Sequence, residues 1–293
     1  MKNLKYIIIV PLCILSIILF ILSIKKINII HNKIHKPTSI EEWTQQDFNI
    51  LFMSKEETKQ FLLEDKDEYV KRLSPIDLYA RKANDAEHYI SNIAKCASFF
   101  SDAEKKKLTR CAKLADKFLD SYTYNDDIRC SEIAKIPWKI AVTRKNGVNQ
   151  YEEGLPHTRG DVIFLSEYVI NDNIAVGEDD MILTSTLIHE KVHIYQRHNP
   201  EIIEKVIEKM GYKVATPNSN TLLKRSNPDT NDKNYYDKNN DLVIFEYNSQ
   251  KPENINDVKD DNFSSEHPYE RMAYDIANEY TKKTMNNITN KII

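Results

Sequence analysis

The sequence predicts an α+β fold that is mainly helical and contains a small sheet. Amphipathic patterns with helix-capping signals occupy residues 51–135, whereas short runs of β-branched and aromatic residues first appear after residue 136. Helical patterns return near residue 180 and again close to the C-terminus. Helices, a few strands and further helices, in this order, are typical of the α+β class. Hydrophobic residues make up 41% of the 293 residues and charged residues 29%, which suits one large domain or two small ones.

An uncharged apolar segment, residues 6–24, precedes this body. As a helix, its nineteen residues would span roughly 28 Å, close to the hydrocarbon thickness of a bilayer. A cleaved signal peptide is the rival interpretation, but its apolar stretch is normally shorter and ends at small residues, whereas Lys25 and Lys26 follow here. We therefore expect residues 1–26 to form an uncleaved single-pass membrane anchor and residues 27–50 a linker. Lysines flank both ends, which leaves the orientation open.

The distribution of charge argues against a nucleic-acid partner. The first 36 residues carry six lysines and no acidic residue, so the rest of the chain holds 35 basic residues against 44 acidic ones. A body with this balance repels a phosphate backbone. The five glycines are also at least six residues apart, too far for a GxGxxG fingerprint, a phosphate-binding loop or the GxSxG motif of serine hydrolases.

Three amphipathic helices are predicted in residues 51–135, which we expect to form a helical subdomain. Each follows a serine that has an acidic residue three positions later, the capping-box pattern. These serines are Ser54, Ser74 and Ser101. The second helix is expected to continue to about Ala97, because its apolar residues keep a helical period that far. We expect all three apolar faces to be buried in a core.

The cysteines do not identify a compartment. Cys13 lies in the apolar segment, and Cys96, Cys111 and Cys130 remain, an odd number without a CxxC pair. A disulfide between Cys96 and Cys111 and a set of three buried thiols are equally compatible with this spacing.

Residues 136–293 are expected to form a second domain, in which strands and helices are mixed. The segment 214–241 is rich in asparagine, lysine and aspartate and contains two prolines, so we expect an exposed insertion there. The last helix is introduced by Pro268. The predicted elements are strands at 138–144, 161–166 and 242–247, and helices at 180–197, 199–213 and 269–284.

The helix predicted at 180–197 contains the sequence His189-Glu190-Lys191-Val192-His193. Residues four apart lie on one face of a helix, so the two imidazoles can bind one zinc ion together. Glu190 lies beside that face, where its carboxylate can reach a metal-bound water as a general base. HExxH also occurs by chance, and the alternative is a solvated helix face with two ordinary histidines.

A catalytic zinc site takes three protein ligands and leaves one position for water. The metzincin pattern is excluded, because Gln196 and Asn199 stand where it requires glycine and histidine. The other common solution takes a glutamate from a later helix. Glu270, in the first turn of the last predicted helix, is our expected third ligand, and Glu266 and His267 are the alternatives.

HEKVH in a helix, followed much later by HPYERMAYD, resembles the gluzincin branch of zincin metallopeptidases, and in particular its uncharacterised members with an NPxExxA type of third-ligand helix. The resemblance covers roughly residues 136–284. It implies a zincin-like catalytic domain with a small sheet, whose edge strand lies above the zinc and binds an extended substrate. By position, residues 160–166 would be that strand.

The resemblance also implies a mechanism. Glu190 takes a proton from a zinc-activated water, and the hydroxide attacks the carbonyl of a peptide bond. The resulting oxyanion needs a second hydrogen-bond donor, for which we place His157 in the site. The candidates for this donor are His157, Tyr195, Tyr269 and Tyr274. Asp275 is either an acceptor that would orient a ligating imidazole or an ordinary surface carboxylate.

We therefore expect a membrane-anchored zinc metallopeptidase that hydrolyses peptides or proteins, with zinc bound by His189, His193 and Glu270. No nucleic-acid partner is expected, and the oligomeric state is left open. One alternative is a non-catalytic anchored protein that keeps a zincin fold for binding; the intact Glu190 argues against it, since such a site needs no general base. The other is a helical structural membrane protein with a coincidental HExxH, which metal content would distinguish.

Overall fold

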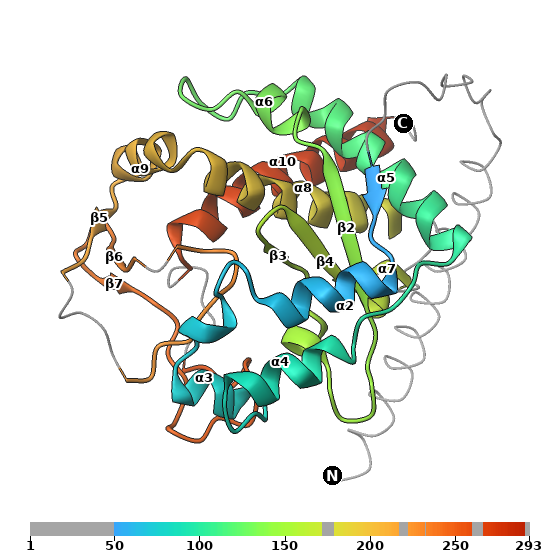
Figure 1. Ribbon diagram of the computed structural model, residues 1–293. Coiled ribbons are helices and arrows are strands. Elements are labelled where there is room, and N and C mark those ends of the chain that lie inside the picture. Colours follow the sequence, from blue (N-terminus) through green and yellow to red (C-terminus); the bar gives the residue numbers. More distant parts are fainter. Residues whose placement is uncertain (1–49, 172–178, 217–221, 232, 260–265, 291–293) are drawn as a thin grey trace, which may run out of the picture. The chain divides into compact units, whose positions relative to one another are not determined.

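The computed structural model describes residues 50–171, 179–216, 222–231, 233–259 and 266–290 (Figure 1). These residues form an α+β structure that is about half helical and contains a small mixed sheet, so the expected class is confirmed. Residues 6–24, where we expect the membrane anchor, lie outside the described residues. Within the described ranges, the search for a helix with the length and apolar character of a bilayer span found none.

The main sheet has four strands in the order β1-β2-β4-β3. β1, β2 and β4 run parallel, and β3 pairs antiparallel with β4, so that His157 lies opposite Phe164. The strands are β1 (Ile50–Phe52), β2 (Trp138–Thr143), β3 (His157–Arg159) and β4 (Val162–Ser166).

The edge position expected for residues 160–166 is wrong, because β4 is an internal strand and β3 forms the edge. All five residues of β4 are buried. A tight turn at Gly160 reverses the chain between the two strands, and its φ of 55° lies in the left-handed region that favours glycine. The edge of the sheet is therefore the three-residue strand β3, and the strand beside it, β4, is buried.

Helices cover both faces of this sheet (Figure 1). One face packs on α5 (Asp102–Asp120), α8 (Asp179–His198) and α10 (Pro268–Asn290), and the other packs on α2 (Lys55–Glu64) and α4 (Ala86–Ala94). Alternate residues of β2 and β4 belong to the two cores, as the period of a strand requires. Ile140, Val142, Ile163 and Leu165 lie in the first core, and Ala141, Val162 and Phe164 in the second.

The remaining elements are short. They are the 3-10 helices η1 (Val70–Arg72) and η2 (Tyr151–Gly154), the helices α3 (Pro75–Ala80), α6 (Cys130–Ala134), α7 (Glu167–Asn171) and α9 (Pro200–Lys209), and a second sheet of β5 (Lys213–Val214), β6 (Tyr235–Tyr236) and β7 (Leu242–Val243). Cys96, Cys111 and Cys130 are buried, free thiols.

Three expectations about these elements need correction. The helix expected from Pro75 to Ala97 is two helices, because Lys82 adopts a positive φ of 57° and Asp85 then caps α4. The strand expected at 242–247 is reduced to the two residues of β7. The segment 214–241 is only partly exposed, since β6 and two buried polar residues, Asp229 and Asn234, belong to it.

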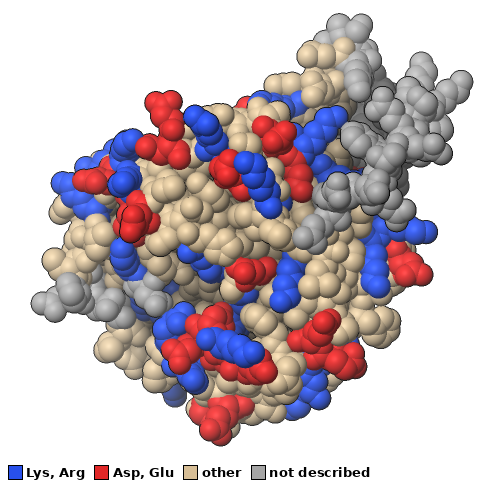
Figure 2. Space-filling view, turned by 45° about the horizontal axis from the view of Figure 1, so that its top comes forward, with Lys and Arg blue, Asp and Glu red and all other residues tan. Residues whose placement is uncertain are grey.

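Acidic and basic side chains are interspersed over the face seen in Figure 2. Exposed ion pairs, such as Arg110 with Asp180 at 2.6 Å, contribute little to stability. Glu104 at the start of α5 is different, because it is buried and bound by three side chains. It accepts hydrogen bonds from the Ser101 hydroxyl at 2.8 Å, from Arg144 at 2.9 Å and from Asn171 at 3.0 Å.

These contacts give Glu104 a measurable effect on stability. Burial opposes ionisation, but the hydrogen bonds from Ser101, Asn171 and Arg144 outweigh it and lower the pKa from 4.5 to about 2. A carboxylate with a lowered pKa stabilises the fold above its unfolded pKa, and this contribution disappears as the pH falls from about 5 towards 2.

Glu104→Ala is expected to lower the free energy of unfolding by about 2–3 kcal/mol at neutral pH, since it removes both the glutamate of the capping box and a buried charged acceptor. Urea unfolding at several pH values measures this, and the difference from wild type should shrink as the pH is lowered. Glu57→Ala is the control: Glu57 forms the same capping box in α2 but is exposed, so its loss should lower the free energy of unfolding clearly less than the loss of Glu104. Equal losses in the two variants would contradict the role of the buried contacts.

Candidate metal centre

Three of the predicted ligands lie together where α8 crosses the start of α10. The Nε2 atoms of His189 and His193 are 3.0 Å apart. Glu270 Oε2 lies 3.0 Å from the first of these nitrogens and 3.4 Å from the second. The structure therefore brings two imidazole nitrogens and one carboxylate oxygen to a single point, although Glu270 follows His193 by 77 residues.

Small side chains allow the two helices to approach closely at this point. Ala273, one turn after Glu270, is fully buried, and Ser185 of α8 donates a hydrogen bond to the carbonyl of Ala277 at 3.2 Å. Pro268 begins α10 in the first turn, where its missing N–H is not needed. Glu270 thus projects from a helix whose start is marked by Pro268 and whose packing against α8 is made close by small side chains.

The donor set fits zinc. Tetrahedral zinc with bonds of about 2.0–2.1 Å places its ligand atoms about 3.3–3.4 Å apart. The observed separations of 3.0, 3.0 and 3.4 Å are close to that value. Two imidazoles and one carboxylate are also a common donor set of catalytic zinc sites.

Gln196 sets the tautomer of His193. The Gln196 side-chain amide donates to the carbonyl oxygen of Tyr269 at 2.9 Å, so its oxygen must be the atom that lies 2.8 Å from His193 Nδ1. That oxygen can only accept, and therefore Nδ1 carries a proton. Burial lowers the pKa of His193, but the charge of Glu270 outweighs it and raises this pKa, and when the ring is neutral its Nε2 has the lone pair that a metal needs. His189 Nδ1 has no hydrogen-bond partner among the described residues, so this constraint acts on His193 alone.

Glu190 lies in the same cleft and is 3% exposed. Its Oε2 atom has no hydrogen-bond partner among the described residues. Burial, followed by the charges of Asp229 and Glu270, raises the pKa of Glu190 well above its usual value. An acidic side chain that is buried, unpaired and adjacent to a cleft is suited to accepting and releasing a proton.

The cleft has a volume of about 630 Å³, within the range of sites for small ligands and peptide segments. Its walls include α8, α10, the segment 155–157 and the loop 225–229. Tyr274 lies on its wall, with its ring centroid 4.4 Å from that of His189. Tyr195 and Tyr269 belong to the helical core instead and do not line this cleft.

His157 also lines the cleft and is 3% exposed. Its Nδ1 lies 3.0 Å from the carbonyl oxygen of Leu155 and therefore carries a proton. Burial lowers the pKa of His157, so the ring is neutral and its Nε2 is an acceptor without a partner among the described residues. In this state His157 does not offer the hydrogen-bond donor that oxyanion stabilisation requires.

The alternative ligands have other surroundings. Glu266 lines the cleft but is not part of the three-atom group, and burial together with the charge of Glu270 raises its pKa to about 7. Both ring nitrogens of His267 are engaged by backbone groups, at 3.3 and 3.2 Å. Asp275 is exposed and accepts a hydrogen bond from Tyr124, as an ordinary surface carboxylate would, whereas Gln196 is the side chain that bonds His193.

The outer edge of β3 is occupied by the chain itself. The backbone N–H of Thr158 donates to Asp229 at 2.6 Å, and its carbonyl accepts from Arg197 at 3.0 Å. Arg197 also donates to the carbonyl of Pro228 at 2.8 Å. An extended substrate therefore cannot pair with this part of the edge, contrary to what the resemblance implies.

Sequence analysis missed the contribution of the segment 226–229. Asn227 donates to Glu270 Oε1 at 2.7 Å, and Asp229 holds β3. No local signal marks these residues, since asparagine and aspartate are common in turns. Gln196 could have been found, because it lies three positions after His193 on the same helix face.

Comparison of the chain with known protein families, with curated proteins and with solved structures gave no match. The function must therefore be inferred from the geometry and chemistry of this centre.

Proposed function

We propose that the protein is a zinc-dependent peptidase of the gluzincin type, anchored to a membrane by residues 6–24. The convergence of His189, His193 and Glu270 on one point is the observation that carries this proposal. The lone pair that His193 directs at this point, and the unpaired Glu190 beside it, add independent support. The anchor rests on the apolar sequence alone.

His189, His193 and Glu270 would hold the zinc. When bound, the metal would polarise the substrate carbonyl and lower the pKa of water in the site. Glu190 then accepts a proton from the attacking water at its carboxylate and delivers it to the nitrogen of the leaving amine. Oε2 of Glu190 is available for this transfer, because it has no hydrogen-bond partner among the described residues.

Tyr274 and His157 would bind the reacting peptide. Burial, and then the charges of Glu270 and Glu266, raise the pKa of Tyr274 above its ordinary value, so its hydroxyl stays protonated and can donate to the developing oxyanion. His157 Nε2, as an acceptor, would take a backbone N–H of the substrate. The substrate lies in the cleft and does not extend the sheet at Thr158.

Metal analysis of the purified full-length protein tests the proposal, with one zinc per chain as the expected result. Zinc binds the folded state, so its removal by a chelator should lower the melting temperature. Adding back free zinc at a hundred times its Kd should raise the free energy of unfolding by about 2.7 kcal/mol. His189→Ala should abolish stoichiometric zinc. The control is His198→Ala on the same helix, whose exposed ring pairs with Asp161. A wild-type protein that binds no zinc would overturn the proposal.

A further inference from the structure

The two carboxylate oxygens of Glu270 have different surroundings. Oε2 lies 3.0 Å from His189 Nε2 and 3.4 Å from His193 Nε2. Oε1 accepts a hydrogen bond of 2.7 Å from the side-chain amide of Asn227. Glu270 is only 5% exposed, so an oxygen without this partner would be left unpaired in a largely buried position.

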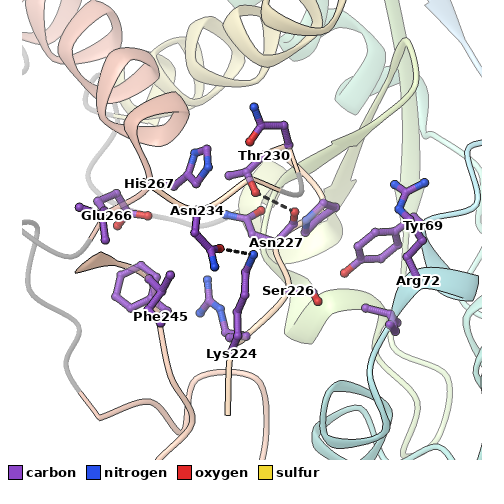
Figure 3. Close-up of a pocket in the computed structure, with 16 residues that line it drawn as sticks. Tyr69, Arg72, Lys224, Ser226, Asn227, Thr230, Asn234, Phe245, Glu266 and His267 are labelled. Carbon is purple, nitrogen blue, oxygen red and sulfur yellow. Dashed lines mark hydrogen bonds between the residues drawn. The ribbon is translucent and has the colours of Figure 1, made fainter. Parts of the chain in front are cut away.

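The donor on Asn227 is oriented by its own turn. The backbone N–H of Asp229 donates to Asn227 Oδ1 at 2.9 Å, and because an N–H can only donate, Nδ2 must be the atom that faces Glu270. Thr230 donates to the Asn227 carbonyl at 3.3 Å, a bond that Figure 3 shows in the small cavity next to the cleft. Asn227 lines both this cavity and the cleft.

The backbone that carries Asn227 is tied to three other parts of the structure. Ser226 donates from its N–H and its hydroxyl to the buried Asp77 of α3, at 2.9 and 2.8 Å. The carbonyl of Pro228 accepts from Arg197 of α8, and Asp229 accepts from Thr158 of β3. An amide held by so many fixed groups needs little reorganisation to keep its bond to Glu270.

We propose that Asn227 is a positioning residue of the metal centre: it holds Glu270 Oε1 so that Oε2 alone faces the two histidines. This inference rests on the proposed function, since it concerns how that centre binds zinc. It assigns a role in the site to the segment 214–241, which the sequence marks only as an insertion. Partners of this kind typically change metal affinity about 10–100-fold when removed.

Asn227→Ser provides the test in the full-length protein. A serine hydroxyl can accept from the N–H two residues later and so preserve the turn, but it is too short to reach Glu270. Zinc affinity, measured by competition with a chromophoric chelator, should fall about 10–100-fold in Asn227→Ser and in Asn227→Ala. Asn231→Ser is the control, because Asn231 in the same segment bonds Glu204 and Tyr235 instead.

Cobalt(II) bound in place of zinc provides a second measurement. If Asn227 restricts Glu270 to one metal-binding oxygen, the loss of Asn227 allows both Glu270 oxygens to bind the metal. The visible absorption bands of cobalt should then change with the coordination number. Wild-type affinity and an unchanged cobalt spectrum in Asn227→Ser would overturn the inference while leaving the peptidase proposal intact. A wild-type protein that binds neither metal would overturn the proposed function itself.

Discussion

Replacing Glu190 with glutamine is expected to abolish peptide hydrolysis while zinc stays bound. Glutamine keeps the shape of the side chain but cannot accept the proton of the attacking water, and general base catalysis contributes about 10²–10⁴-fold to the rate. Glu190 is not one of the three grouped ligands, so the metal content should remain one zinc per chain. Turnover of a mixed peptide library, followed by mass spectrometry, together with elemental analysis, measures both properties.

Glu201→Gln is the matched control for this experiment, because Glu201 is exposed at the start of α9 and lies outside the cleft lining. It should leave both turnover and zinc unchanged. If Glu190→Gln cleaves peptides as fast as wild type, the assigned general base is wrong. If the wild-type protein holds zinc but cleaves nothing in the library, the non-catalytic binding protein becomes the better interpretation.

Glu270→Ala is expected to lower zinc affinity by about 100-fold or more, since it removes a direct ligand whereas loss of an outer partner costs 10–100-fold. Glu266→Ala provides the comparison, because Glu266 lies just before α10 and lines the same cleft. It should keep the zinc, because Glu266 is not part of the three-atom group. Zinc titration of the metal-free variants measures the difference, and the reverse result would place the third ligand four residues earlier, before α10 begins.

The features that were predictable from the sequence depend on local signals. The capping boxes at Ser54 and Ser101 form as expected, because a serine and a glutamate three residues apart satisfy each other's backbone groups whatever surrounds them. The HExxH spacing places His189 and His193 on one helix face for the same reason. Glu270 could be proposed because Pro268 marks the start of its helix.

The features that were not predictable depend on contacts between distant segments. β3 is only three residues long, and its pairing with β4 follows from the reversal at Gly160 more than from any propensity of its own. The positive φ of Lys82 interrupts a helical pattern that the apolar period alone would continue. Asn227 becomes part of the centre only because Ser226 and Asp229 are held by other elements.

The outer edge of β3, whose backbone groups at Thr158 are already hydrogen-bonded, has a consequence for aggregation. An exposed edge strand offers its unpaired backbone groups to any passing chain, and this is a common route to aggregation. At Thr158 the backbone N–H and carbonyl are already bonded to Asp229 and Arg197, so a strand of a second molecule cannot pair with them. The same loop that supports the candidate centre thus also protects the protein from associating with itself through this edge.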